Sequence, residues 1–379
     1  MNLHLTEEQQ MVLETVRAFV EKEVKAVAST MDAASEFPRR LIQMLAEMGL
    51  MGAFIPAEYG GSGMDLLTYI LVMEEISKGW ASLGVIMTVN NSLVCDPLHR
   101  FGNEAQKQNY LVPLAQGRLL GCYALTEPSA GSDAGAIATQ ARKEGSDYVL
   151  NGTKLFITNG KNADVAIVYA VTDPSRGKKG ISAFIVEKTF PGFHVGKIED
   201  KMGLRGSDTA ELIFQECRVP SENLLGVENE GFKIALSTLD GGRIGIAAQA
   251  IGIAQGSLEE ALTYAKARKQ FGQAIAEFQA IQWMLADMKT EIDAARLLTH
   301  RAAWTRQQGK PVTLMAAEAK LYASEMANRV AYKAVQVFGG YGFIKDFPVE
   351  RFYRDARITT LYEGTSEIQR MVIARHLLQ

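Results

Sequence analysis

One carboxylate and one polar turn have residue types that could do chemistry. Glu363 lies in residues 361–365 between two helical runs, and a carboxylate beside Gly364 could point freely into a cleft and act as a base. Residues 126–133 (Thr-Glu-Pro-Ser-Ala-Gly-Ser-Asp) offer hydroxyls and backbone amides, which can hold a phosphate. The plainer alternatives are a solvated loop glutamate and a simple turn.

The composition indicates a globular protein of two or three domains. The chain has 379 residues, of which 47% are hydrophobic and 22% charged, enough to bury a large core. The formal net charge is −3, and acidic and basic residues are interspersed along the chain. A nucleic-acid binder would carry a basic face or a positive balance, so we expect no nucleic-acid partner.

Metal and membrane signals are missing from the sequence. The three cysteines form no CxxC, and the five histidines are scattered, so we expect neither a disulfide framework nor a metal site. No stretch approaches the roughly 18 apolar residues of a membrane span, and the N-terminus has no secretory pattern. We expect a cytoplasmic protein, or a mitochondrial matrix protein if a targeting segment has been removed.

The elements that must position these residues change character twice. Residues 1–119 read as helices, with a capping box at Thr6 and Gln9, helical runs over 38–50 and 66–78, and a glycine-rich turn at 60–63. Residues 120–225 hold short apolar or β-branched runs, which predict an antiparallel sandwich or barrel with strands over 147–150, 155–157, 165–171, 181–186 and 211–214.

The last third of the chain returns to helical periodicity. An apolar stripe over 278–295 steps by three and four residues, and an alanine-rich helix over 314–338 stops at the glycines of 339–342. The chain is therefore predicted to be α+β and mostly α. It has no βαβ alternation that would predict a parallel nucleotide-binding sheet.

Three segments together resemble the signatures of the acyl-CoA dehydrogenase family. Residues 125–133, 338–342 and 362–369 stand in the family's order and spacing, and the similarity covers essentially the whole chain. The resemblance implies an N-terminal helical domain over 1–119, a central β domain over 120–225 and a C-terminal four-helix bundle over 226–379. It also implies FAD bound without a Rossmann fingerprint, which fits the absence of GxGxxG here.

The resemblance also implies a set of ligand contacts. On the chain's own side it implies flavin contacts from Tyr123, Leu125, Thr126, Phe156, Thr158, Thr365 and Glu367. Phe156 stands where many members have tryptophan. Ser132 is implied to hold a phosphate of CoA, with Arg243 and Gly364 also at the substrate.

A further group is implied to reach the FAD of a neighbouring subunit in a homotetramer built from two dimers. This group comprises Arg268, Phe271, Gln336 and Gly340. For Phe271 the alternative is simple core packing, and for Arg243 it is a structural ion pair.

The implied reaction removes an α proton and a β hydride from an acyl-CoA thioester, giving a trans-2-enoyl-CoA. Glu363 would be the base, and its backbone N–H and a ribityl hydroxyl of FAD would stabilise the enolate oxygen. An acyl chain that displaces water should raise the pKa of this carboxyl. Isovaleryl- and long-chain-type members place their base at a position that falls here on Gly241 or Gly242, which have no side chain.

Several alternatives stay open at this point. The segments 85–93, 199–203 and 241–246 look closest to the short-chain, butyryl-CoA type, while short branched or cyclic acyl groups remain open. Acyl-CoA oxidases and nitroalkane oxidases share the implied scaffold, but Glu363 and the compact length argue against both. A non-catalytic FAD- and CoA-binding relative is a further alternative. The implied electron acceptor is an electron-transfer flavoprotein.

Overall fold

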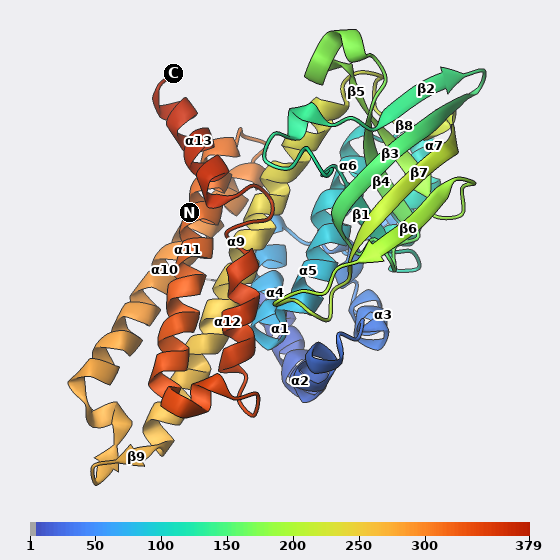
Figure 1. Cartoon of the computed structure of the whole chain (residues 1–379). Coiled ribbons are helices and arrows are strands. Elements are labelled where there is room, and N and C mark those ends of the chain that lie inside the picture. Colours follow the sequence, from blue (N-terminus) through green and yellow to red (C-terminus); the bar gives the residue numbers. More distant parts are fainter. Residues whose placement is uncertain (1–4) are drawn as a thin grey trace.

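The computed structural model describes residues 5–379. Residues 1–4, which include His4, lie outside this described part. They begin the N-terminal segment in which the sequence shows no secretory pattern. Figure 1 shows helices, then a sheet, then a second set of helices along the chain. In residues 5–379 no helix is long and apolar enough to cross a membrane, and no three His, Cys, Asp or Glu side chains group as a metal site would require.

The first region is helical, as the sequence predicts. It contains α1 Glu7–Phe19, α2 Lys25–Ala34, α3 Arg39–Glu47, α4 Leu66–Gly79, α5 Ala81–Thr88, α6 Asp96–Phe101, α7 Glu104–Gln106 and α8 Val112–Ala115. The predicted capping box is confirmed, because the Gln9 N–H donates to the Thr6 hydroxyl and the Thr6 N–H to the Gln9 side chain. Three π-helical segments interrupt this region without a sequence signal: Val20–Val24, Val89–Cys95 and Lys107–Leu111.

The second region is one eight-stranded sheet, in which β1 branches off beside β4 and the other strands follow the order β6-β7-β3-β2-β4-β5-β8. Its strands are β1 Gly121–Ala124, β2 Gln140–Glu144, β3 Asp147–Thr158, β4 Val165–Val171, β5 Ile181–Glu187, β6 Phe193–Ile198, β7 Thr209–Pro220 and β8 Leu224–Leu225. Most neighbours pair antiparallel, as predicted, but β1 and β2 both run parallel to β4. Long connections separate β4 from β1 and β2, and parallel pairing needs such connections.

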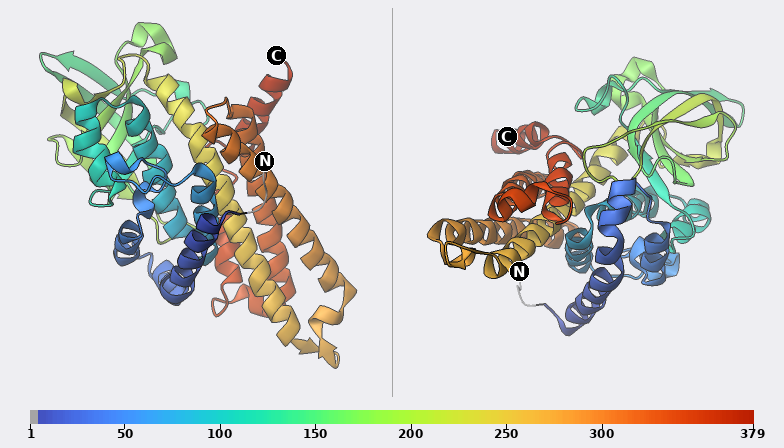
Figure 2. Two further views of the ribbon diagram at one scale, coloured as in Figure 1. Left: turned by 180° about the vertical axis from the view of Figure 1, so that it is seen from behind. Right: turned by 60° about the horizontal axis from the view of Figure 1, so that its bottom comes forward.

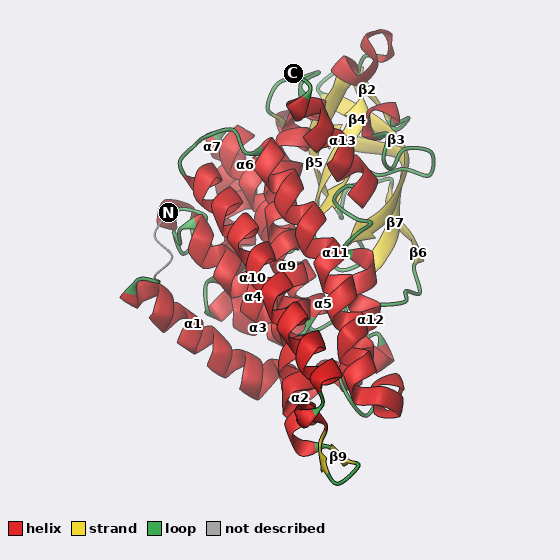
Figure 3. Cartoon of the chain, turned by 90° about the vertical axis from the view of Figure 1, so that its left-hand side faces the viewer, coloured by secondary structure: helices red, strands yellow, loops and turns green. Residues whose placement is uncertain are grey.

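Strand β4 explains why its sequence is an unbroken apolar run. Val165, Ile167 and Tyr169 face a core shared with the first helices, whereas Ala166 and Val168 face the core inside the sheet. Both faces of this strand are buried, so no position needs a polar side chain. Figure 3 shows the sheet behind the helices.

The third region is the predicted helical bundle. Its long helices are α9 Gly231–Ala267, α10 Gln279–Gln307 and α11 Thr313–Phe338, followed by α12 Val349–Ile358 and α13 Ser366–Leu377. The hairpin of β9 Lys269–Gln270 and β10 Gln273–Ala274 joins α9 to α10. Helix α9 packs against α4 and runs from the sheet to the far end of the bundle, which Figure 2 shows from two further sides.

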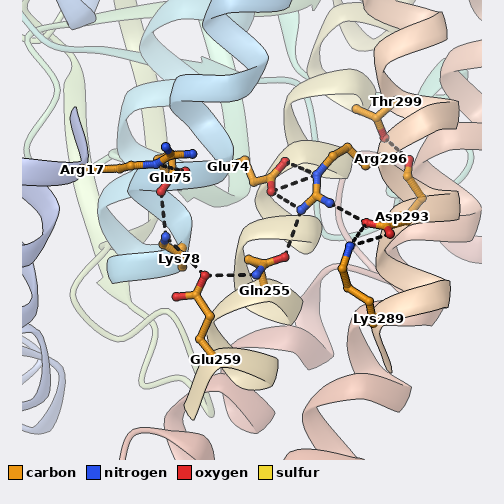
Figure 4. Close-up of polar contacts among 11 residues, drawn as sticks. Arg17, Glu74, Glu75, Lys78, Gln255, Glu259, Lys289, Asp293, Arg296 and Thr299 are labelled. Carbon is orange, nitrogen blue, oxygen red and sulfur yellow. Dashed lines mark hydrogen bonds and ion pairs between the residues drawn. The ribbon is translucent and has the colours of Figure 1, made fainter. Parts of the chain in front are cut away.

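A partly buried polar network joins the first helices to the bundle (Figure 4). The guanidinium of Arg296 on α10 donates from Nε to both carboxylate oxygens of Glu74 on α4, at 3.2 and 3.1 Å. It also donates to Gln255 on α9 at 3.0 Å and to Asp293 at 2.9 Å. One side chain thus ties three helices from two regions of the chain.

Replacing Arg296 by methionine is expected to lower the free energy of unfolding by about 2 kcal/mol. Breaking a fully buried pair costs roughly 3–5 kcal/mol, and the 24% exposure of Arg296 reduces this penalty. Chemical denaturation measures the change. Lys289→Met is the matched control, because its pair with Asp293 is solvent-exposed and contributes less than about 1 kcal/mol. Equal destabilisation by both variants would contradict the prediction.

Candidate active site

Glu363 sits in a short loop whose backbone is held in an uncommon conformation. Helix α12 ends at Ile358, and Thr365 caps α13 by accepting a hydrogen bond from the Ile368 N–H. Glu363 and Gly364 both adopt left-handed angles, with φ of 55° and 88°. For a glutamate this conformation costs on the order of 1 kcal/mol or more, so other contacts must hold it.

The carboxylate of Glu363 points toward α9. A Cβ atom placed on Gly242 would lie 2.6 Å from Glu363 Oε2 and 2.8 Å from Leu93 Cδ2, so a side chain at this position would force one of these two side-chain ends to move. Oε2 is buried and has no hydrogen-bond partner within residues 5–379. The alternative of a solvated loop glutamate is therefore wrong.

Two cations affect the proton affinity of this carboxyl. Burial raises the pKa of Glu363 to about 7, while Arg243 on α9 and Lys320 on α11 oppose that rise. Arg243 is buried and pairs with Asp240 at 2.8 Å, and Asp240 also accepts a hydrogen bond from Thr313 at 2.6 Å. The structural ion pair expected as an alternative for Arg243 is present, and the same guanidinium also acts on Glu363. A carboxyl with this pKa is half ionised at neutral pH and can accept a proton.

A buried ion pair fixes the turn that follows β1. The ammonium of Lys154 on β3 donates to Glu127 Oε1 at 2.7 Å and to the Leu125 carbonyl at 3.1 Å. The Glu127 carboxylate also accepts the backbone N–H groups of Ala138 and Thr139. Both charged side chains are almost fully buried, with exposures of 0% and 4%. This turn is therefore more rigid than its composition alone indicates.

Beside this turn the sheet presents an aromatic ring to solvent. The Leu155 N–H donates to the Thr126 carbonyl at 2.9 Å, which sets β3 next to residues 125–126. The following residue, Phe156, is 62% exposed at a φ of 58°, and Thr126 and Thr158 are half-buried. Tyr123 on β1 lies close enough to Glu363 for the carboxylate to contribute to its raised pKa, whose main cause is burial.

A pocket of about 720 Å³ opens from Arg243 toward the surface. Its lining carries six cationic side chains, Arg176, Lys178, Lys179, Lys233, Arg243 and Arg375, and two anionic ones, Asp240 and Glu230. Gly135, three residues after Ser132, lies next to the pocket, because a Cβ on Gly135 would lie 3.4 Å from Lys178 Cβ. Ser132 itself is solvent-exposed.

Comparisons with known proteins give the family. Three family models match in succession: the N-terminal domain of acyl-CoA dehydrogenase over residues 6–118, the middle domain over 122–217 and the C-terminal domain over 229–378. A short-chain specific acyl-CoA dehydrogenase of Clostridium acetobutylicum is 52% identical over 99% of both chains. This chain belongs to the acyl-CoA dehydrogenase family.

Two solved structures agree with this assignment. The butyryl-CoA dehydrogenase of Megasphaera elsdenii is 49% identical over 100% of both chains, with a TM-score of 0.98. A chain in a structure of the electron transferring flavoprotein of Acidaminococcus fermentans is 53% identical over 100% of both chains, with a TM-score of 0.99. The fold class predicted from the sequence is confirmed.

FAD is the cofactor of acyl-CoA dehydrogenases, and residues of this chain fit it. An exposed aromatic face at Phe156, next to the hydroxyls of Thr126 and Thr158, suits a flat ring system with polar edges. On the Glu363 side, Thr365 is half-buried. Glu367 is exposed in the first turn of α13, near Arg370.

The remaining predicted flavin contacts lie at the opposite end of the bundle. Arg268 follows α9, roughly 40 Å from Gly242 at about 1.5 Å per helical residue. Phe271 is 92% exposed in the β9–β10 turn, so the core-packing alternative for this side chain is wrong. Gln336 and Gly340 are also exposed, and a pocket of about 410 Å³ lies among Arg268, Gly340 and Tyr341.

Four residues that shape the Glu363 loop and the turn after β1 were assigned no role from the sequence: Glu127, Lys154, Lys320 and Gln369. One signal for Lys320 was present. It stands in register with Ala316, Ala323 and Ala327, on the apolar stripe of an alanine-rich helix. A lysine at such a position is buried and needs a partner.

Proposed function

We propose that this chain catalyses the FAD-dependent α,β-dehydrogenation of a short-chain acyl-CoA of the butyryl-CoA type to the trans-2-enoyl-CoA, with Glu363 as the base. The observation that carries the proposal is the Glu363 carboxylate above Gly242, whose Oε2 is buried without a partner and whose pKa burial raises to about 7. The short-chain and butyryl-CoA enzymes that resemble the whole chain support this choice of acyl group.

The hard step is removal of the α proton of a thioester, which is a very weak acid. Glu363 accepts this proton, and its elevated pKa brings the base close to working pH. The backbone N–H of Glu363 donates to the thioester carbonyl and so stabilises the negative charge that develops there. FAD, when bound, accepts the β hydride. Bound acyl chain excludes water and strengthens these electrostatic interactions.

Each predicted ligand contact on this chain's side has a proposed role. Tyr123, Leu125, Thr126, Phe156, Thr158, Thr365 and Glu367 hold the flavin on this chain's side. Arg243 and Gly364 orient the acyl thioester, and Ser132 binds a phosphate of CoA. The net positive pocket next to Gly135, three residues after Ser132, supports this last role, because CoA carries several phosphate charges.

The distant group of predicted flavin contacts requires a second copy of the chain. Arg268, Phe271, Gln336 and Gly340 are too far from Glu363 to reach a cofactor bound there. We therefore propose that they serve the FAD of a neighbouring subunit in a homotetramer of two dimers. The 92% exposure of Phe271 supports an interface at this end.

We further propose an electron-transfer flavoprotein as the acceptor of the reducing equivalents. The similarity to a chain in a structure of such a flavoprotein supports this partner. The place of action would be the cytoplasm, or the mitochondrial matrix for a chain whose targeting segment has been removed.

Anaerobic titration of the purified flavoprotein with butyryl-CoA tests the function. We expect a yellow protein whose flavin absorbance bleaches on addition of substrate. Bleaching only with branched, cyclic or longer acyl-CoAs would contradict the short-chain assignment. Rapid reoxidation of the reduced protein by oxygen would favour an oxidase instead, and a flavin that no acyl-CoA reduces would favour the non-catalytic relative.

A further inference from the structure

A fully buried lysine contacts the loop that carries Glu363. Lys320 on α11 has 0% exposure, and its ammonium donates to the Gly364 carbonyl at 2.7 Å. Burial of a lysine is expensive unless its charge and donors are used, so this position has a purpose beyond packing. The neighbouring positions on the same face of α11, Ala316 and Ala323, are small and buried.

A second buried side chain, on α13, also donates hydrogen bonds to this loop. Gln369 on α13 donates to the Glu363 carbonyl at 3.1 Å and to the Gly364 carbonyl at 2.9 Å. The two carbonyls are thereby held toward α11 and α13. The left-handed angles at Glu363 and Gly364 then leave the carboxylate facing α9.

Lys320 also contributes an electrostatic effect. Burial lowers its pKa to about 7, and the Glu363 carboxylate opposes that change. The charged or titratable groups acting on this pair come from every element around it: Tyr123 on β1, Arg243 on α9, Glu325 on α11, Tyr362 in the loop and Glu367 on α13. Arg243 is the one cation in this group, so the cations that act on Glu363 are Arg243 and Lys320 itself.

We propose that Lys320 is a positioning residue that holds Glu363 in its left-handed conformation and supplies a positive charge that favours the ionised carboxylate. This inference rests on the proposed role of Glu363 as the base. Gln369 shares the first task and has no part in the second, because its amide is neutral. Replacing each side chain in turn therefore separates the effect of the loop geometry from the effect of the positive charge.

Lys320→Met and Gln369→Met test these two tasks against wild type. For Lys320→Met we expect the pH midpoint of flavin reduction by butyryl-CoA to rise by about one unit. That shift alone slows reduction at pH 7 about fivefold, with a KM close to that of wild type. For Gln369→Met we expect slower reduction at an unchanged midpoint. Lys333→Met on the same helix is the control, because Lys333 pairs with Asp287 and Glu291 on α10.

A second readout does not depend on turnover. Infrared difference spectra of each ligand-free protein, taken against the corresponding Glu363→Gln variant, follow protonation of the Glu363 carboxyl directly. The pH midpoint of this protonation is expected to rise by the same amount in Lys320→Met, and in no other variant. Thermal melts establish that the variants fold, and Gly364 keeps its bond from Gln369 when Lys320 is replaced.

Two results would overturn the inference. One is an unchanged carboxyl titration in folded Lys320→Met, and the other is an equal shift in Gln369→Met or Lys333→Met. A failure of the proposed function looks different, because wild-type flavin would then not be reduced by butyryl-CoA while the infrared titration could still be read.

Discussion

Glu363→Gln is expected to lower the rate of flavin reduction by butyryl-CoA by about 10³-fold, within the range of roughly 10²–10⁴ for loss of a general base. The amide has nearly the volume of the carboxyl but cannot accept the α proton. It also removes an ionisable group whose Oε2 is buried without a partner, so the melting temperature should not fall. Stopped-flow spectroscopy of the flavin-loaded protein gives the rate, and a thermal melt gives the stability.

Wild type should show the matching pH dependence. Since burial raises the pKa of Glu363 to about 7, the ionised base accumulates as the pH rises through 7, and the reduction rate rises with it. Glu318→Gln on α11 is the control, because Glu318 pairs with Arg301 on α10 and has no proposed role in the reaction. Retention of more than a tenth of the wild-type rate in pure Glu363→Gln would assign the base to another residue.

Lys154→Met is expected to destabilise the protein by about 3–5 kcal/mol and to weaken retention of FAD. The substitution leaves the Glu127 carboxylate buried without its counter-charge, and it frees the Leu125 carbonyl beside the proposed flavin surface. Urea denaturation measures the loss of stability. The fraction of flavin that remains after gel filtration measures the effect on the cofactor.

Two further variants check the cause of this loss. Lys143→Met removes an exposed lysine from the neighbouring strand β2 and should change stability by less than about 0.5 kcal/mol. Lys154→Met combined with Glu127→Gln should recover part of the loss, because no unpaired charge stays buried. A double variant less stable than Lys154→Met would show that the backbone contacts of Glu127 matter more than its charge.

The sequence predicted the elements whose burial follows a simple pattern. Strands β4 and β5 are mainly apolar runs rich in β-branched residues because both faces of each are covered, and α11 follows its alanine stripe to Gly339. Strand β3 was predicted as two pieces, since Asn151-Gly152 usually marks a turn. In the structure the strand passes through Gly152 with a shift in register, and the side chain of Thr139 fills the space where a Cβ would stand.

Short polar strands could not be predicted in the same way. Strand β2, Gln140–Glu144, consists mainly of charged and polar residues, and its pairing with β3 and β4 decides its conformation. The parallel pairing of β1 is likewise a tertiary property. Local propensity carries no information about which distant strand lies alongside.

At the site, the residues that match the family pattern could be predicted from the sequence. Residues whose role depends on being buried next to a distant partner could not. The family resemblance predicted Glu363 and Phe156. Lys154 looks like an ordinary surface lysine until the fold buries it, and only the alanine stripe around Lys320 indicates its burial. Their roles depend on partners 27 and 44 positions away along the chain.

The close approach of Gly242 to Glu363 also constrains how such a base can migrate during evolution. A side chain gained first at position 242 would collide with the resident carboxylate, whereas Glu363→Gly would first relieve the left-handed backbone. Either order of change therefore displaces or removes the resident carboxylate before a new base on α9 is in place. Selection tolerates such a step most readily in a duplicated gene copy.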